Sequence, residues 1–264
     1  MYNSKSIVLV QSSALLIIFL PFTHSFYRVL YYAVFGMFTD RMDAGEKLAG
    51  KLLHYEGQSP MVIAIPRGGV EIGFAVARKL HAPLDVVIVR KLGAPHNMEF
   101  GVGAIAEDDV GYIDRNMIEH LQISQSALRL VEAREYRELI RRKQFYRNGE
   151  SLPLLTNKTV ILVDDGLATG ASARAALLSI KKHHPKKIIF AVPVCSEDTA
   201  SAIRLLVDAF VCLEHTEQFE AVGRYYRDFH QMNDEEVMKL LQKSKEKQVS
   251  LRFGENSFGH KIVW

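Results

Sequence analysis

The chain has 264 residues, of which 48% are hydrophobic, and it carries a formal net charge of +3 at neutral pH. This length and apolar content suffice for one sizeable domain with its own core, and they exclude a disordered chain. The charge is too small to indicate nucleic-acid binding without a clustered basic face, so we expect no nucleic-acid partner. Cys195 and Cys212 lie in apolar stretches with no metal-type or redox-type partner nearby. We therefore expect two buried thiols in a reducing compartment.

Residues 1–36 form an apolar extension that differs from the rest of the chain. The apolar run from Ile7 to Leu20 is shorter than the roughly 20 residues that a spanning helix needs. It is followed by Arg28 and a second apolar stretch, and no small-residue cleavage site follows it. We favour a start of translation at Met37, which predicts a cytoplasmic protein; the alternative is a membrane-tethered protein with a cytoplasmic domain. Residues 37–246 would then form the functional domain, and residues 247–264 a C-terminal tail.

From Asp40 onward the apolar residues alternate between helical and strand periods, which predicts an α/β fold whose parallel sheet is flanked by helices. In chain order we expect helices near 42–53, 70–81, 124–147, 171–183, 196–206 and 233–245, and strands near 61–65, 84–90, 112–114, 159–163, 187–194 and 209–213. Ser124 is a predicted N-cap, and Asn233 with Glu236 resembles a capping box. The glycine-containing stretch from Lys91 to Gly103 predicts a mobile loop. The charged residues of the long helix at 124–147 are interpreted as a solvated face.

Two adjacent carboxylates, Asp164 and Asp165, follow the strand at 159–163. Ligands of open α/β sheets bind beyond the carboxyl ends of the strands. An acidic pair there can accept hydrogen bonds from ribose hydroxyls or hold a hydrated Mg²⁺. The small residues from Gly166 to Ser172 leave backbone N–H groups open, and the next helix points its positive end at them, which predicts a phosphate site. The alternative is a turn whose Asp pair merely caps the helix.

The segment Val160 to Ser172, VILVDDGLATGAS, resembles the diphosphoribose-binding signature of type I phosphoribosyltransferases. The resemblance implies that family's fold with a small hood, and transfer of ribose 5-phosphate from 5-phosphoribosyl 1-diphosphate (PRPP) to a nitrogenous acceptor. Pyrophosphate would be released with the assistance of Mg²⁺. Asp164 and Asp165 would hold the ribose hydroxyls and the metal, and the loop would wrap the 5-phosphate. The substrate-binding residues implied here are Asp164, Asp165, Gly166, Ala168, Thr169, Gly170, Ala171 and Ser172.

Two basic motifs extend the resemblance. Pro66-Arg67-Gly68-Gly69 follows the strand at 61–65, where the family has its pyrophosphate loop. Arg67 would pair with the diphosphate, and Gly68 and Gly69 would permit its close approach. The alternative is a tight turn with a surface arginine. Arg90 and Lys91 match an R-K pair that reaches the diphosphate, and the predicted loop after them would close over the site and exclude water.

Three residues bear on the acceptor. Glu99-Phe100-Gly101 resembles the Glu-Tyr-Gly of adenine phosphoribosyltransferases, so Glu99 is a candidate general acid or base; a solvated carboxylate is the alternative. Phe219, in the aromatic segment QFEAVGRYYRDF, is a candidate for stacking on a base, unless these aromatics belong to the core. Ala168 counts against a 6-oxopurine acceptor, because relatives acting on those bases usually carry an aspartate there.

Residues 40–245 as a whole resemble a bacterial subgroup of predicted phosphoribosyltransferases without a settled acceptor. On this resemblance the substrates are PRPP and an acceptor base, and the catalytic candidates are Arg67, Arg90, Lys91 and Glu99. Members of the family are commonly dimers, which makes a homodimer an expectation. The alternative function is a non-catalytic module that binds PRPP as a regulatory signal.

Overall fold

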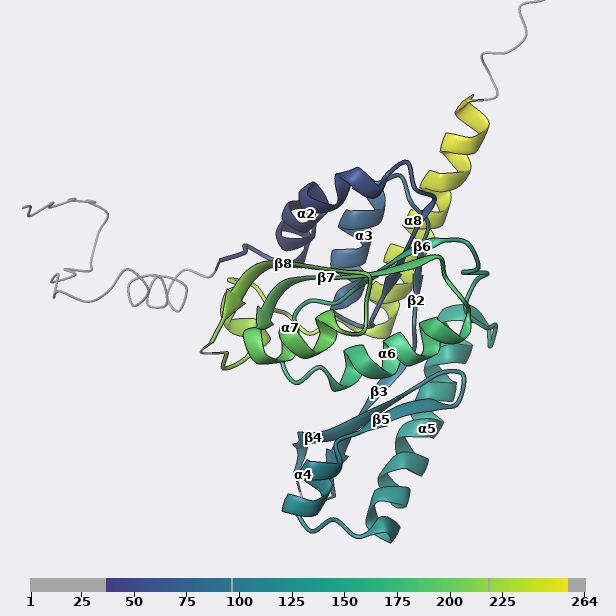
Figure 1. Cartoon of the computed structure of the whole chain (residues 1–264). Helices are drawn as coiled ribbons and strands as arrows, with labels where there is room; N and C mark the ends of the chain where they lie inside the picture. The colour runs from purple at the N-terminus through teal and green to yellow at the C-terminus, as the bar shows by residue number, and fades with distance from the viewer. Residues whose placement is uncertain (1–36, 96, 218, 256–264) are drawn as a thin grey trace, which may run out of the picture.

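The computed structural model describes residues 37–95, 97–217 and 219–255. Its main sheet has five parallel strands in the order β2-β1-β6-β7-β8 (Figure 1). In chain order these strands are β1 (Pro60–Ala64), β2 (Leu84–Val86), β6 (Thr159–Val163), β7 (Lys187–Ser196) and β8 (Ala209–Thr216). The predicted α/β fold with a parallel sheet is therefore confirmed.

Helices cover both faces of this sheet (Figure 1). One face carries α2 (Arg41–Leu52), α3 (Gly69–Lys79) and α8 (Asp234–Glu255), and the other carries α6 (Ala171–Lys182) and α7 (Glu197–Arg204). All five residues of β1 and of β6 are buried, as expected for strands covered on both sides. Within β6, Ile161 packs into the core beneath α2 and α3, whereas Leu162 packs into the core beneath α6.

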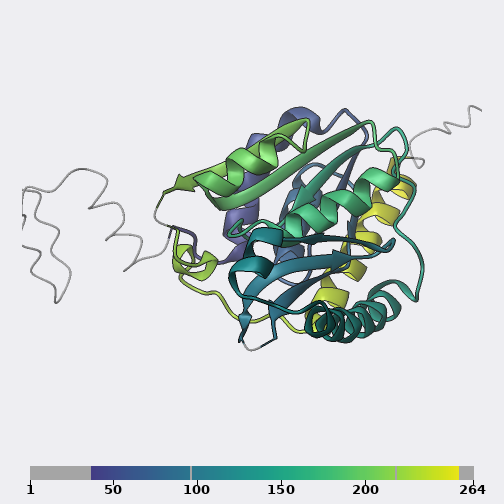
Figure 2. The same cartoon turned by 60° about the horizontal axis from the view of Figure 1, so that its bottom comes forward.

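A second, antiparallel sheet is inserted between β2 and β6 of the chain. It contains β3 (Val89–Ala94), β4 (Asn97–Ala106) and β5 (Val110–Ile113), followed by α4 (Arg115–His120) and α5 (Gln125–Arg147). This sheet lies between α6 and α5 (Figure 2). Two short 3-10 helices complete the described chain, η1 (Leu53–Tyr55) and η2 (Val222–Tyr225).

The prediction of a loop without regular structure for residues 91–103 is wrong, because the segment forms most of the β3–β4 hairpin. The mobility predicted for it stays a prediction. Leu92 and Val102 are buried in a small core shared with α5, while Ala104 is buried on the side of α6. A Cβ at Gly93 would lie 2.3 Å from the carbonyl oxygen of Met98, so glycine here allows close approach of two strands. The strand predicted at 84–90 is likewise broken, since β2 ends at Val86 and β3 begins the second sheet.

The interpretation of the charged residues of α5 as a solvated face is wrong for three of them, while Arg129, Arg134, Arg137 and Arg141 are exposed. Glu135, Arg142 and Arg147 are buried on its inner side. Arg147 donates a hydrogen bond to the buried carboxylate of Glu107, which follows β4. Charged groups can be buried when they pair with one another, and on α5 they share the inner side with the buried Val131, Leu139 and Tyr146.

The predicted caps at Ser124 and Asn233 are confirmed, whereas Ser196, at the start of α7, makes no side-chain cap hydrogen bond. The Ser124 hydroxyl accepts a hydrogen bond from the backbone N–H of Ala127 at 3.2 Å. Asn233 and Glu236 form a reciprocal capping box, with N···O distances of 2.7 and 2.9 Å. The helix that follows, α8, extends beyond its expected end near Lys245.

The described fold begins at Met37, where the chain pairs with the segment after β8. The backbone N–H groups of Met37 and Phe38 donate to the carbonyl of Tyr225 at 2.8 and 2.9 Å, and the Phe38 side chain is buried. Our expectations for residues 1–36 lie outside the described residues. Among the helices of residues 37–255 that are described, none combines the length and the hydropathy needed to cross a bilayer.

Candidate active site

A cavity of about 420 Å³ opens at the carboxyl ends of β1 and β6. Its lining combines the loop after β1, the start of β3, the loop after β6, one residue of α5 and one of η2. The charged, hydroxyl-bearing and glycine residues of the lining are Arg67, Gly68, Arg90, Lys91, Arg142, Asp164, Asp165, Gly166, Thr169, Gly170 and Ser172. Ala168 and Ala171 also line it. The structure thus brings most of the sequence-predicted site residues around one space.

The acidic pair lies on the cavity wall, and hydrogen bonds from Arg41 and Tyr226 hold Asp165 in place. One carboxylate oxygen of Asp165 accepts a hydrogen bond from Nε of Arg41 at 2.9 Å, and its carbonyl accepts one from the Tyr226 hydroxyl at 2.6 Å. Oδ1 of Asp164 accepts from the backbone N–H of Asp165 at 2.9 Å. Burial, and then the negative charge of Asp165, raise the pKa of Asp164 well above its usual value. The pair therefore presents carboxylate oxygens to the cavity in fixed positions.

The glycines after β1 let this loop contact the acidic pair. A Cβ added to Gly68 would lie 1.9 Å from Oδ2 of Asp165 and 2.8 Å from Nε of Arg41. A Cβ on Gly69, which begins α3 just behind the cavity, would lie 3.0 Å from the Cα of Asp164. The peptide bond between Pro66 and Arg67 is cis. Any side chain at Gly68 would displace the carboxylate that Arg41 holds.

Four cationic side chains line the cavity, and they are held to different degrees. Arg90 is fixed by the buried Glu135, whose Oε2 accepts from Nε at 2.9 Å and from Nη2 at 2.6 Å. Arg142 is buried, with Nε bonded to Glu138 at 2.9 Å. Arg67 is 37% exposed, and its Nη1 lies 3.8 Å from Asp234. Lys91 is exposed at the edge of the same space. Together they supply the positive charge of the cavity lining.

The loop after β6 is held by hydrogen bonds to β7 and α7, while the start of α6 that follows it is uncapped. The backbone of Leu167 bonds to Val194 and Ser196 at the end of β7, at 2.9 and 3.0 Å. The Thr199 hydroxyl donates to the carbonyl of Ala168 at 2.6 Å. No side chain caps the start of α6, whose N-cap residue is Gly170 with φ of 76°. The first N–H groups of α6 are thereby available to an anionic ligand.

Gly69 and Phe219 do not line the cavity, and the side chain of Glu99 lies outside the described part of the chain. The Phe219 ring is half-buried and stacks on Tyr225, with centroids 5.7 Å apart and an angle of 24° between the planes. Glu99 lies in β4. The roles assigned to Phe219 and Glu99 stay predictions.

Sequence reasoning missed three residues that hold the site. Arg41 and Tyr226 each bond to Asp165, and Arg142 reaches the cavity from α5. Arg142 was hidden among the many charged residues of its helix. The signal for Arg41 was its place in the opening helix, DRMDAGEKLA, which contributed only to the family resemblance.

The acidic pair has a donor set that suits Mg²⁺. Magnesium prefers oxygen ligands and is commonly held by one or two carboxylates together with substrate phosphates. Two neighbouring carboxylates, one of them with a raised pKa, form a site where a cation would relieve like-charge repulsion. Asp164 and Asp165 therefore fit this metal.

A five-stranded parallel sheet flanked by helices, with an acidic pair and a small-residue loop after β6, defines the type I phosphoribosyltransferase fold. The family model described as "Phosphoribosyl transferase domain" matches residues 37–230. The chain belongs to this family.

Relatives agree with this assignment. Two Mycobacterium tuberculosis sequences, named "Putative phosphoribosyl transferase" Rv0571c and MT0597, are each 39% identical to this chain over 208 residues. The match covers 79% of this chain but 47% of those proteins, so the chain spans about half the length of these curated relatives. The crystal structure of TT1426 from Thermus thermophilus is 38% identical and has a TM-score of 0.64. That likeness covers 78% of this chain and 98% of TT1426.

Proposed function

We propose that the chain is a phosphoribosyltransferase that binds PRPP in the 420 Å³ cavity and transfers ribose 5-phosphate to a nitrogenous acceptor with release of pyrophosphate. One observation carries this proposal: a single cavity is lined by an acidic pair, an uncapped helix start and four cations. These three features match the three polar parts of PRPP, which are its ribose hydroxyls, its 5-phosphate and its diphosphate.

The donor would be oriented by charge and hydrogen bonding. Asp164 and Asp165 would accept hydrogen bonds from the ribose hydroxyls, since ionised carboxylates are acceptors only. The N–H groups and hydroxyls from Ala168 to Ser172 would bind the 5-phosphate at the positive end of α6. The diphosphate would then lie toward the loop after β1 and the start of β3.

The leaving group would be stabilised electrostatically. Arg67, Arg90, Lys91 and Arg142 supply positive charge where pyrophosphate develops its additional negative charge, and preorganised charge is a large contribution to catalysis. Because the transition state would resemble an oxocarbenium ion, this mechanism needs no covalent nucleophile from the protein. The chain's task is to hold donor and acceptor in the reacting geometry.

Mg²⁺ would be held beside Asp164 and Asp165, and it would supply positive charge that neutralises the diphosphate. The acceptor would be a nitrogenous base other than a 6-oxopurine, as Ala168 predicts. Phe219 would stack on that base, and Glu99 would handle its proton.

The test is pyrophosphate release by the purified full chain incubated with PRPP, Mg²⁺ and a panel of nucleobases. We expect release with at least one base, and a severe loss of turnover or of PRPP affinity in Asp165→Asn. Asp198→Asn is the matched control, because Asp198 is an exposed carboxylate in the first turn of α7. That variant should behave like the wild type.

Calorimetric titration with PRPP separates catalysis from sensing. PRPP binding without pyrophosphate release for any acceptor would support the non-catalytic PRPP-binding module instead. Full activity in Asp165→Asn, or failure of the wild type to bind PRPP in the presence of Mg²⁺, would sink the proposal.

A further inference from the structure

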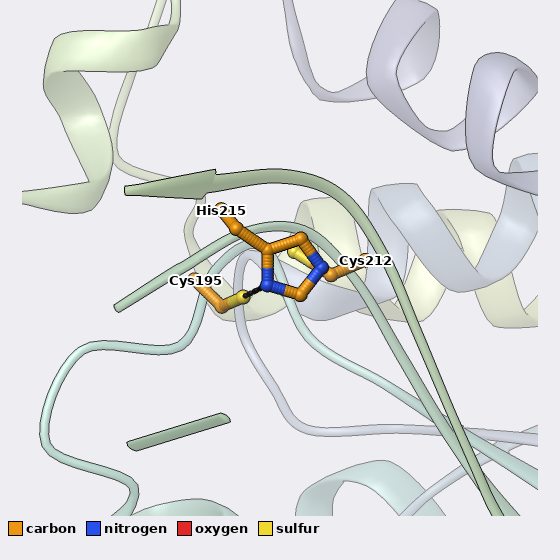
Figure 3. A group of neighbouring side chains, drawn as sticks. All are labelled: Cys195, Cys212 and His215. Atoms are coloured by element: carbon orange, nitrogen blue, oxygen red, sulfur yellow. Dashed lines mark hydrogen bonds between the residues drawn. The ribbon is translucent and has the colours of Figure 1, made fainter. Parts of the chain in front are cut away.

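A second group of chemically active side chains lies at the ends of β7 and β8. Cys195, Cys212 and His215 each offer one metal-ligand atom, and these three atoms lie within 4.8 Å of one another. Figure 3 shows the three side chains pointing toward one another, with Sγ of Cys195 3.3 Å from Nδ1 of His215. The expectation of two thiols without a metal-type partner is therefore wrong.

The pairing of the two strands creates this group. Cys195 is the register partner of His215, which lies next to it across the parallel ladder. Cys195 is fully buried in the core beneath α6, and the half-buried Cys212 packs against the same core. Cys212 and His215 are three residues apart, so strict alternation would place them on opposite faces of the strand. Ligand atoms of both residues nevertheless lie within 4.8 Å of Sγ of Cys195.

The donor set of this group is characteristic of zinc. Zn²⁺ binds Cys sulfur at about 2.3 Å and His nitrogen at about 2.0 Å, so tetrahedral ligands lie roughly 3.5–3.8 Å apart. The observed Sγ–Nδ1 separation of 3.3 Å is close to that value. Oε2 of Glu197 lies 2.8 Å from the same Nδ1 and pairs with the imidazole, but Glu197 is not among the three residues whose ligand atoms converge.

The charges around the group are balanced for a divalent ion. Two thiolates offset the charge of Zn²⁺, and Glu197 is already paired with Arg204, whose Nη1 donates at 2.9 Å. Nη2 of Arg204 lies 3.4 Å from Nδ1 of His215, so this guanidinium would shift slightly as the metal takes that nitrogen. His215 is 35% exposed, which gives an ion access from solvent.

We propose that the chain binds one Zn²⁺ through Cys195, Cys212 and His215, as a site separate from the donor cavity. Binding releases the two thiol protons to solvent, and each sulfur then donates an electron pair to the metal. The site lies directly behind the donor loop, because Leu167 of that loop forms a parallel bridge with Cys195. The metal therefore fixes the end of β7 on which this loop rests.

The experiment uses the untagged full chain, stripped with a chelator under reducing conditions and then titrated with Zn²⁺. Native mass spectrometry should show one zinc per chain with the loss of two protons, and Co²⁺ should give thiolate-to-metal charge-transfer absorption. His215→Ala and Cys212→Ser should lose both signals, while His120→Ala, a histidine of α4, should keep them. Zinc should also raise the melting temperature of the wild type but leave that of His215→Ala unchanged.

Three results would overturn the assignment. These are no stoichiometric zinc in the wild type, full zinc binding by His215→Ala, or unchanged reactivity of both thiols in excess zinc. Rapid formation of an intramolecular disulfide in place of metal binding would equally count against it. Circular dichroism establishes that each variant is folded. If a cysteine variant does not fold, His215→Ala still tests the proposal, because a partly exposed side chain can be removed with little effect on folding.

Discussion

The ion pair between Arg41 and Asp165 joins α2 to the acidic pair, and we expect Arg41→Met to destabilise the protein strongly. Only 5% of the Arg41 side chain is exposed. Its Nε donates to Asp165 at 2.9 Å, its Nη1 donates to the carbonyl of His230 at 2.8 Å, and its guanidinium lies 3.9 Å from the centroid of Phe229. Methionine would fill much of the same volume but would leave the carboxylate and the carbonyl without this donor.

The magnitude follows from these contacts. Removing one partner of a buried ion pair costs about 3–5 kcal/mol, because the remaining charge is left without compensation. Asp165→Asn in the same background removes that charge, so the double variant should be less destabilised than the sum of the single variants. We expect a coupling free energy of about 1.5–3 kcal/mol, typical of a hydrogen bond to a charged group.

Urea unfolding at pH 7, followed by circular dichroism without ligand, measures all four members of this cycle. Lys47→Met is the control, because Lys47 pairs with Asp43 on the exposed side of the same helix. It should change the free energy of unfolding by about 0.5 kcal/mol or less. A coupling of Arg41 with Asp165 below about 0.5 kcal/mol, which counts as additive behaviour, would refute the reasoning.

Three further predictions concern the cavity. Gly68→Ala should weaken PRPP binding about 10-fold or more by calorimetry, since the new Cβ would meet Oδ2 of Asp165. The control is Gly50→Ala, because nothing lies within 4 Å of a Cβ at that position. It should bind PRPP normally and gain up to about 1 kcal/mol in the free energy of unfolding. Asp164 has a raised pKa, so the native state binds its proton more tightly than the unfolded chain, and stability falls as the pH rises above 3.8 until the group is ionised. Asp164→Asn should therefore be more stable than the wild type at pH 7 and less dependent on pH, yet bind PRPP more weakly; lower stability at pH 7 would contradict this. Arg142→Met should weaken PRPP binding roughly 10-fold or more through the loss of a charge-assisted contact. Arg137→Met, at an exposed position of the same helix, should bind PRPP like the wild type. Equal affinities of the two variants for PRPP would show that Arg142 does not contribute to the site.

Features that depend on neighbouring residues were predictable from the sequence. The apolar run of β6, the acidic pair after it and the small-residue start of α6 follow one another within Val160 to Ser172. The caps at Ser124 and Asn233 also act within one turn. Such patterns report local hydrogen bonding and periodic burial, and these determine where an element begins and what its end can bind.

The tertiary structure decided which distant residues complete these local features. Arg41 reaches Asp165 across 124 positions of sequence, and Arg142 becomes part of the cavity only because α5 packs against the body. The glycine-containing segment from Lys91 to Gly103 forms a hairpin whose Leu92 and Val102 pack against Val131 of α5, a residue distant in sequence.

By itself, the sequence determined the α/β architecture and the motif after β6, because each rests on the burial and backbone bonding of adjacent residues. Only the tertiary structure decided how the acidic pair is held, which cations line the same cavity, and that Cys195, Cys212 and His215 converge. Charge pairs and metal-ligand sets form wherever folding brings side chains within a few ångströms, and sequence periodicity carries no record of those distances.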